Sequence, residues 1–418
     1  MNNLTKFAFT PLVLLYLTGT TLYTGLVNAA TFVGEGTAAG AQCGSRGVNN
    51  NGVVTGMCLP GNVSGPAVAW VAVTAGTEVP LPPLVTGQSC DALGIANNGT
   101  IAGVCVTADN RATGVFWSAT APSSLPQKLQ SLSVLGTGLL PEVATAITAY
   151  NQSGVLGGES LSGSNDATAV LWLAGSTAPV QLSILHDNCR VADVNDTPIN
   201  GVPSSALNCP NTATGNDTAK VVQKTGLLGA LVTTVLSTPS GSTGCSLSSV
   251  NNAMQMLGTC HFAAPDTPSA AYWASPASTP VLLSSVSGVA GTPRIEGLRL
   301  NNNGNAVVSY QNTDGHALLA FWAASTTGAT TLIPTLAGGT HVGFVDLSDN
   351  DTVALTSENT GEHAQAATWT AAAGTVAIPQ FNAGEESGLT AISPNGSYVA
   401  GIAEDSAHND DAVVATLP

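Results

Sequence analysis

Side chains that could act in acid–base chemistry or ligand binding are scarce in this chain, and several lie in its expected loops. Only 8 % of the 418 residues are Asp, Glu, Lys or Arg. Glu385 and Glu386, together with Glu296, are candidates for the paired carboxyl groups of a glycosidase or lyase, provided that the fold brings them close together. The alternative is that loops carry charge because they contact water. The candidate ligand-binding residues in these loops are Glu142, His186, Asp187, Arg190, Arg294 and His341.

The motifs of common enzyme mechanisms are absent from the sequence. It contains no G-x-S-x-G, H-E-x-x-H, P-loop or G-x-G-x-x-G segment. The stretch GEGTAAG at 34–40 comes close to the last of these, but it precedes a β repeat and is expected to be a loop. We therefore expect no cofactor, and we favour binding over catalysis while leaving an enzyme open.

Two groups of residues carry side chains that can bind metals. The carboxylates of Asp346, Asp349 and Asp351 could hold calcium, although Asp is also a common turn residue. His316, His363 and His408 share one repeat position, which we expect to lie away from the centre of the fold, so they should be dispersed around its periphery. We predict structural roles for both groups and no metal site.

The eight cysteines fall into pairs around turns. Three pairs have their two cysteines 15 positions apart on either side of a turn: Cys43/Cys58, Cys90/Cys105 and Cys245/Cys260. Cys189/Cys209 spans a longer loop in the same way. These pairs should face each other on adjacent antiparallel strands, where the Cβ separation suits a disulfide. The spacing predicts four disulfides, and a metal site would need closer spacing.

A repeat of roughly 49 residues explains the positions of the cysteines. Each unit has an Asn-Gly turn or a similar turn, followed about twenty residues later by a short strand that usually ends in Trp. All six tryptophans of the chain lie at this repeat position. The turns lie at 49–52, 97–99, 151–154, 195–197, 251–253, 301–304, 349–351 and 394–396.

The repeat predicts an all-β fold: a single β-propeller of eight four-stranded blades, in which strand A is innermost and strand D outermost. The last unit stops after strand C, and the segment ATFVGEG at 30–36 stands where a strand D is missing, so the N-terminal strand should close the ring. A seven-bladed ring is the alternative if the fourth unit, which lacks Trp, is not a full blade.

The sequence resembles the repeat of the extracellular HAF-repeat proteins. The units GVNNNGVVTG and GIANNGTIAG match the first half of that repeat, and His316 with Trp322 and His363 with Trp369 match the second half. The resemblance implies secretion and a propeller-like repeat, and it implies no established activity.

Residues 1–29 have the pattern of a secretory signal peptide, with Lys6, an apolar run and small residues before Ala29, which leaves residues 30–418 as the propeller. We expect a secreted monomer, extracellular or periplasmic, without membrane insertion. The net charge of −16 argues against binding to nucleic acid.

The functional prediction is ligand binding, to a glycan or a cell-surface protein, on the face that carries the disulfides and the loops from strand D to strand A. By analogy, propellers often bind ligands there, near the axis. The alternatives are a polysaccharide hydrolase or lyase, and an interaction scaffold of the cell envelope.

Overall fold

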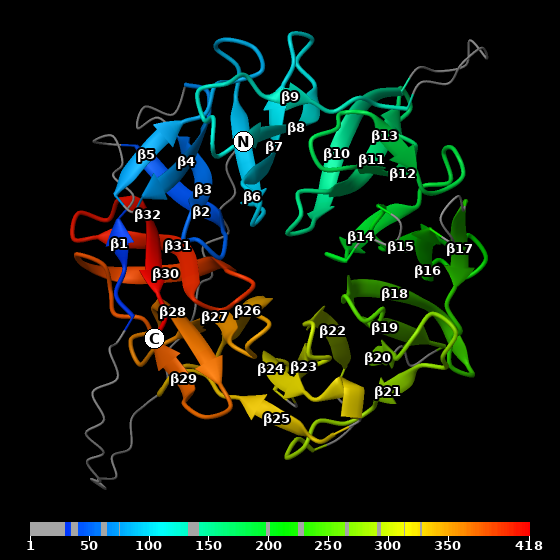
Figure 1. Cartoon of the computed structure of the whole chain (residues 1–418). Coiled ribbons are helices and arrows are strands. Elements are labelled where there is room, and N and C mark those ends of the chain that lie inside the picture. Colours follow the sequence, from blue (N-terminus) through cyan, green and yellow to red (C-terminus); the bar gives the residue numbers. More distant parts are fainter. Residues whose placement is uncertain are drawn as a thin grey trace, which may run out of the picture.

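The computed structural model describes residues 30–418 except 35–40, 60–64, 75, 133–141, 198–200, 225–229, 264–266, 291–293, 313 and 327. The expected signal peptide lies outside the described residues. The described chain forms eight four-stranded antiparallel sheets, arranged as blades around an open centre (Figure 1). The predicted all-β propeller with eight blades is therefore confirmed, and the seven-bladed alternative was wrong.

The first four blades each use four consecutive strands. Blade 1 consists of β2 (Gln42–Val48), β3 (Val54–Leu59), β4 (Val68–Thr74) and β5 (Thr77–Pro80). Blade 2 consists of β6 (Cys90–Ile95), β7 (Thr100–Val106), β8 (Ala112–Ser118) and β9 (Gln127–Lys128). Blade 3 consists of β10 (Glu142–Tyr150), β11 (Leu156–Ser162), β12 (Ala167–Trp172) and β13 (Pro179–Gln181). Blade 4 consists of β14 (Arg190–Val194), β15 (Ser205–Pro210), β16 (Asp217–Lys224) and β17 (Leu231–Val235).

Blades 5 to 7 follow the same order. Blade 5 consists of β18 (Ser242–Val250), β19 (Met256–Phe262), β20 (Ser269–Trp273) and β21 (Val281–Leu283). Blade 6 consists of β22 (Ile295–Leu300), β23 (Ala306–Gln311), β24 (Ala317–Trp322) and β25 (Thr330–Ile333), with a 3₁₀ turn at Ala324–Thr326. Blade 7 consists of β26 (Val342–Leu347), β27 (Val353–Glu358), β28 (Ala364–Thr370) and β29 (Gly374–Ala377).

Blade 8 joins the two ends of the propeller. Its strands β30 (Ala383–Ile392), β31 (Tyr398–Asp405) and β32 (Asp410–Thr416) come from the end of the chain, and β1 (Val33–Gly34) supplies the outer strand. Val33 pairs with Val414 and Gly34 with Val413, so the predicted closure by the N-terminal strand is confirmed (Figure 1). Among the described residues, no helix is long and apolar enough to cross a membrane.

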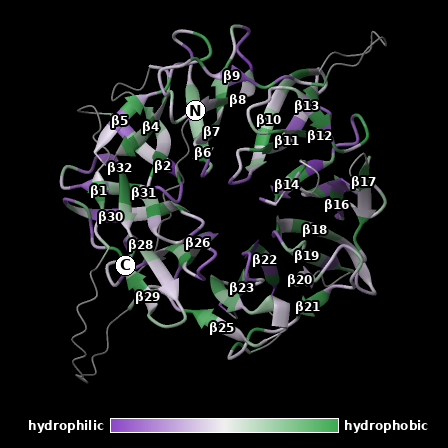
Figure 2. Ribbon diagram, in the orientation of Figure 1, coloured by the Kyte–Doolittle hydropathy of each residue, from purple (hydrophilic) through white to green (hydrophobic). Residues whose placement is uncertain are grey.

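The apolar core lies between neighbouring blades. Figure 2 shows many strands in the hydrophobic colour, whereas the hydrophilic colour is frequent in the loops. Each Trp of strand C packs on the preceding blade, as Trp273 of blade 5 does on Val221 and Leu236 of blade 4. The indole nitrogen of Trp273 also donates a hydrogen bond to the carbonyl of Ser237, at 2.9 Å. Strands A and B carry mostly small residues, so a large aromatic side chain is needed to fill the space between the blades. The predicted common repeat position was wrong for Trp70, which lies within β4 opposite Gly56, two residues before the place that Trp takes in the other blades.

The four predicted disulfides are present as predicted. They join Cys43 to Cys58, Cys90 to Cys105, Cys189 to Cys209 and Cys245 to Cys260, each between strands A and B of one blade. Their Cα atoms lie 4.0–4.2 Å apart. Such bonds form and persist in oxidising compartments.

We predict that Trp273→Ala lowers the free energy of unfolding by about 3–5 kcal/mol, because it leaves a cavity between two blades. Val222 holds the matching position in blade 4, opposite Ser205 as Trp273 is opposite Met256. Val222→Ala should cost only about 1.5 kcal/mol, from two methyl groups at roughly 0.8 kcal/mol each. Chemical denaturation measures both values. Equal losses would show that Trp273 contributes no more than Val222 to the packing between neighbouring blades.

Candidate binding site on the propeller axis

A polar cavity of about 390 Å³ lies on the axis of the propeller. Its walls are the last residues of strand A and the turn to strand B in seven of the eight blades, blade 2 being the exception. The size falls within the range of small-molecule binding sites. We call this cavity the axial pocket.

A β-bulge in every strand A shapes the axial pocket. The ladder between strands A and B shifts register at the third residue from the end of strand A in all eight blades. Bulges re-aim the side chains next to them. We call the residue that follows the bulge the axial position. It is occupied, in blade order, by Gly47, Gly94, Ala149, Asp193, Ser249, Arg299, Asp346 and Ala391.

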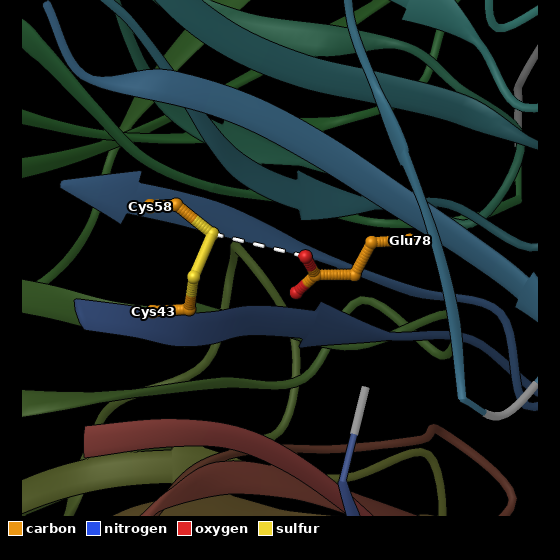
Figure 3. A group of neighbouring side chains, drawn as sticks. All are labelled: Cys43, Cys58 and Glu78. Carbon is orange, nitrogen blue, oxygen red and sulfur yellow. Dashed lines mark hydrogen bonds between the residues drawn. A yellow bond between two sulfur atoms is a disulfide. The ribbon is translucent and has the colours of Figure 1, made fainter. Parts of the chain in front are cut away.

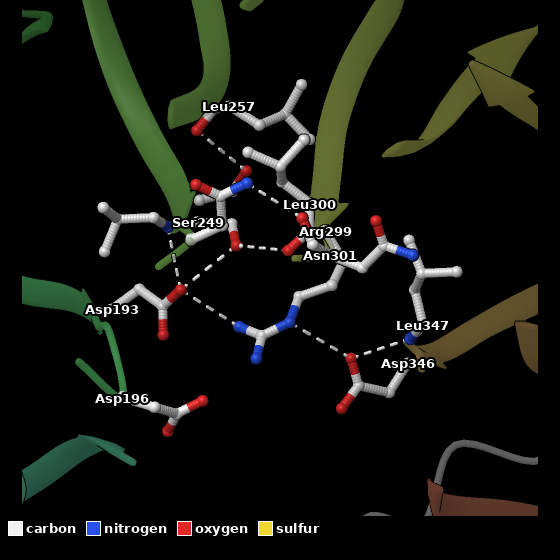
Figure 4. A network of polar contacts seen from close by, with 12 residues as sticks. Asp193, Asp196, Ser249, Leu257, Arg299, Leu300, Asn301, Asp346 and Leu347 are labelled. Atoms are coloured by element: carbon white, nitrogen blue, oxygen red, sulfur yellow. Dashed lines mark hydrogen bonds and ion pairs between the residues drawn. The ribbon is translucent and has the colours of Figure 1, made fainter. Parts of the chain in front are cut away.

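Arg299 bridges two carboxylates at the axial positions of blades 4 and 7. Its Nη1 lies 3.2 Å from Asp193 Oδ2, and its Nε lies 3.3 Å from Asp346 Oδ1 (Figure 4). Ser249, between them in the ring, donates its hydroxyl to Asp193 Oδ2 at 3.1 Å. The backbone amide of Val250 donates to the same oxygen at 2.9 Å. One guanidinium thus ties three neighbouring blade interfaces together.

The protonation of this group follows from its surroundings. Burial raises the pKa of Asp346, and the nearby Arg299 partly offsets the rise. The Asp193 carboxylate raises the pKa of Arg299 further above its already high value. Arg299 therefore stays charged at any pH at which the protein folds.

Tyr150 fills the opposite side of the axis, where the axial positions are glycines. A Cβ on Gly94 would lie 2.5 Å from the Tyr150 ring and hydroxyl, so only glycine leaves room for this side chain. Burial raises the pKa of Tyr150 to about 12, and the Asp346 carboxylate adds to the rise. The positive charge of Arg299 and the backbone amide of Ile95 oppose part of this rise in the pKa of Tyr150.

The rim of the axial pocket is a closed circle of hydrogen bonds between the turns. The second turn residue of one blade donates its backbone amide to the side-chain oxygen of the equivalent residue in the next blade, as from Gln152 to Asp196 Oδ1 at 2.6 Å. At blade 8 the carbonyl of Pro394 replaces the side chain, accepting from Asp349. Asn395 then donates to Asn50 Oδ1 and closes the circle. The remaining links join Asn50 to Asn97, Asn97 to Gln152, Asp196 to Asn252, Asn252 to Asn302 and Asn302 to Asp349.

The lining of the pocket has more carboxylates than cations. Asp193, Asp196, Asp346 and Asp349 line it, against Arg299 and Arg46. Burial raises the pKa of Asp196, the amide of Gln152 opposes the rise, and the Asp193 carboxylate adds to it. The pocket therefore favours neutral or cationic groups over anions.

Of the candidate catalytic and ligand-binding residues predicted from the sequence, none whose side chain the structure describes lines the axial pocket, whereas two of the candidate calcium ligands, Asp346 and Asp349, do. Glu385 and Glu386 of blade 8 lie 3.9 and 3.7 Å from nitrogens of His363. Glu296 is on blade 6, and blade 7 stands between it and this pair. The side chain of Glu142 lies outside the described residues.

The other candidates take part in local contacts. His341 Nδ1 lies 3.0 Å from Glu358 Oε2, and its ring lies against that of His316, with 4.7 Å between the centroids. Arg190 Nε lies 3.7 Å from Glu159 Oε1. Asp187 accepts a hydrogen bond from Ser183 and lines a separate cavity of about 460 Å³ between blades 3 and 4. His186 also belongs to the loop before β14, and Arg294 is exposed just before β22. A common site formed by these residues stays a prediction.

The candidate calcium ligands are engaged in the propeller framework. Asp346 binds Arg299, and Asp349 accepts from Asn302. Asp351 accepts from Asn301 and Asn305, at 2.7 and 3.0 Å. Asp349 and Asp351 thus lie in the turn and bond to the neighbouring turn, as expected of turn residues, whereas Asp346 lies on β26 and pairs with Arg299, so its interpretation as a turn residue was wrong.

Among the described residues, two groups of metal-ligating residue types lie close together, and both contain a disulfide. Glu78 Oε2 lies 3.9 Å from the sulfur of Cys58, which is bonded to Cys43 (Figure 3). Asp187 is similarly placed beside Cys189 and Cys209. Because the thiolate is the form that binds metals, cysteines in disulfides cannot serve as such ligands.

Asp346 and Asp349 were predicted only as possible calcium ligands, and Asp193, Asp196 and Arg299 were not predicted, although the repeat contains a signal for the axial position. In five units the axial position holds Gly, Ala or Ser, whereas it holds Asp193, Arg299 and Asp346 in the others. Only 8 % of the residues of this chain are charged. Charged residues at a repeat position that holds a small residue in the other units therefore indicate a functional site.

The sequence matches no known family model and no curated protein, so the resemblance to HAF-repeat proteins stays a prediction. The structure is similar to solved β-propeller proteins. Prolyl oligopeptidase B from Galerina marginata, in its apo form, aligns with a TM-score of 0.55 and 10 % identity, over 92 % of this chain and 55 % of that one. The β-propeller domain of the Trilobed protease from Pyrococcus furiosus aligns with a TM-score of 0.51 and 9 % identity, over 82 % of this chain and 99 % of that one.

A third similar structure is the Aleuria aurantia lectin in complex with Fucα1-6GlcNAc, with a TM-score of 0.36 and 10 % identity, over 84 % of this chain and 96 % of that one. At these identities the first two similarities, with TM-scores above 0.5, establish the propeller fold alone, and the similarity to the lectin supports no conclusion. This chain spans about half the length of prolyl oligopeptidase B. The Trilobed protease propeller has an open velcro topology, whereas pairing of β1 with β32 closes the ring here.

We predict that Arg299→Met lowers the free energy of unfolding by about 2 kcal/mol, because it leaves Asp193 and Asp346 without their cation. This value is less than for a fully buried pair because the guanidinium is partly exposed to the pocket. Arg46→Met is the control. Arg46 lies 3.7 Å from Asp91, and both side chains are more exposed than those of Arg299 and Asp193. Its substitution should therefore lower the free energy of unfolding by only about 0–1 kcal/mol. Urea denaturation at neutral pH compares the two, and a loss no larger for Arg299→Met would contradict the assigned bridge.

Titration of Tyr150 gives a second test of this site. With a pKa near 12 in the folded protein and near 10 when unfolded, its contribution to stability is present below about pH 10 and is lost between pH 10 and 12. The absorbance of tyrosinate should therefore be the same in the wild type and in Tyr150→Phe up to about pH 11. A difference that is complete by pH 11 would mean that the ring is not buried as described.

Proposed function

We propose that this protein is a secreted ligand-binding β-propeller that recognises the end of a glycan in the axial pocket. The observation that carries the proposal is the pocket itself, a single cavity in which polar side chains from seven blades converge. The four disulfides support an oxidising, extracytoplasmic location.

The chemistry of the lining suits a polyhydroxylated ligand. Carboxylates and amide oxygens accept hydrogen bonds from hydroxyl groups, while amide nitrogens and guanidinium groups donate them. Asp196, Gln152, Asn252 and Arg299 supply both kinds of group, and Phe344 adds an aromatic wall. The surplus of carboxylates disfavours acidic glycans and nucleic acids.

The position of the pocket differs from the predicted one. The turns between strands A and B form its rim, and they lie on the face opposite to the disulfides. The proposal therefore moves the ligand from the loops between strands D and A to the axis. The predicted site on the disulfide-bearing face becomes the competing hypothesis, with catalysis by Glu296, Glu385 or Glu386 as its enzymatic form.

The test is retention of the purified protein on a panel of neutral, basic and acidic polysaccharides, with released sugars measured in parallel. We expect retention without release. Thr390→Trp, at the half-buried wall of the pocket, should abolish retention because the indole fills the space that the ligand needs. Thr331→Trp, on the outer strand β25 and exposed, makes the same substitution away from the pocket and should retain binding.

Two further variants separate the competing sites. Glu296→Gln and Glu385→Gln should leave retention unchanged. If either abolishes retention while Thr390→Trp does not, the ligand binds on the disulfide-bearing face. Release of sugars that is lost in these variants would establish the hydrolase or lyase, and absence of retention on every polysaccharide would overturn the glycan proposal.

A further inference from the structure

One oxygen of a buried carboxylate faces the axial pocket without a donor from the described part of the chain. The side chain of Asp193 is only 8 % exposed, yet its three described contacts all go to Oδ2, from Arg299, Ser249 and Val250. Figure 4 shows the other oxygen directed away from Arg299, on the side of Asp196. Because Asp193 lines the pocket and this oxygen has no donor within the described chain, it is available to a hydrogen-bond donor of a ligand.

Asp196 stands three residues further along the chain, where strand A of blade 4 turns. Its Oδ1 accepts the amide of Gln152 at the rim, and within the described structure no cation lies in ion-pair distance of its carboxylate. The charges of Asp193 and Asp196 repel each other. The carboxylates of Asp193, near the end of β14, and of Asp196, in the turn that follows, therefore carry two negative charges, and within the described structure only Asp193 of the two forms an ion pair with Arg299.

The kind of cation follows from the number of ligands. Calcium takes 6–8 oxygen atoms, but Asp349 and Asp351 are held in turn contacts with Asn302, Asn301 and Asn305. A ligand guanidinium is a larger, planar group, and it would have to lie beside the like-charged guanidinium of Arg299. An ammonium is a compact point charge with three donors, and it can bridge two carboxylates from one small space.

Resting on the proposed glycan binding, we propose that the ligand is an amino sugar whose protonated amine lies between Asp193 and Asp196. Arg299 is positively charged and repels the amine, which therefore binds the oxygen of Asp193 that is directed away from Arg299. The sugar hydroxyls then lie toward the amide groups of the rim, such as those of Gln152 and Asn252.

The test measures the affinity of the full mature protein for a trisaccharide of glucosamine and for its fully N-acetylated form. Isothermal titration is done at pH 6 with physiological salt, which screens long-range attraction to the acidic protein. We expect the free amine to bind at least tenfold more tightly than the acetylated form, because acetylation removes the charge that strengthens these hydrogen bonds.

Asp196→Asn should abolish this preference, and Asp349→Asn is its matched control. Both residues hold the second turn position and both accept a backbone amide through Oδ1. Asn fills that position in four other units, as Asn50, Asn97, Asn252 and Asn302, so both variants should fold. Each removes one charge from the pocket. Asp349→Asn should change the affinity for the amine less than threefold.

The outcomes separate this inference from the function on which it rests. Equal losses in the two variants would show a general charge effect and would overturn the amine position. Equal binding of the two trisaccharides, lost on Thr390→Trp, would overturn the inference and leave the axial glycan site standing. Binding of neither trisaccharide, with no retention on any polysaccharide, would overturn both.

Discussion

The closed circle of hydrogen bonds between the turns is the constraint on which the rest of the structure depends. Each turn between strands A and B has a backbone amide that neither strand can satisfy, and the side chain of the next blade accepts it, as between Asn252 and Asn302. These amides range from half-buried to exposed, so each hydrogen bond contributes only about 0.5–1.5 kcal/mol, and the circle acts through the repetition of the bond around the ring. Every strand A must therefore reach the same level along the axis, and this common level brings the eight bulges and the eight axial positions into register. Blade 8 obeys the same rule, although its link from Asp349 uses the carbonyl of Pro394.

Because the circle holds the framework, the axial positions are free to differ between blades. Gly47 and Gly94 are packed so closely that a Cβ on Gly47 would lie 2.8 Å from the Gly94 Cα atom. On the other side of the axis, Arg299 needs the length of its side chain to reach both Asp193 and Asp346. A regular scaffold thus carries an asymmetric centre, with a charged half and a half filled by Tyr150. Asymmetry of this kind is what recognition of a small, asymmetric ligand requires.

The sequence predicted the features that follow from the repeat, including those present in only some units, such as Trp in six blades and a disulfide in four. The blades, the Trp wedges, the four disulfides and the closing N-terminal strand all follow from a repeat that can be read by eye. Blade 4 was the doubtful case because it lacks Trp, yet Val222 takes the same place in its core. The axial pocket could not be predicted in this way, since it depends on one position that differs between units and on side chains that meet across the ring. Arg299 and Asp193 are 106 residues apart, and only the closure of the propeller places them together.

A crystal structure of the mature protein with a glucosamine oligosaccharide tests the central claim most directly. We expect electron density for a sugar in the axial pocket, with its amine between Asp193 and Asp196 and its hydroxyls toward the rim. Density for the sugar against Asp187, His341 or Glu385 on the opposite face, with the axial pocket holding only water, would contradict it.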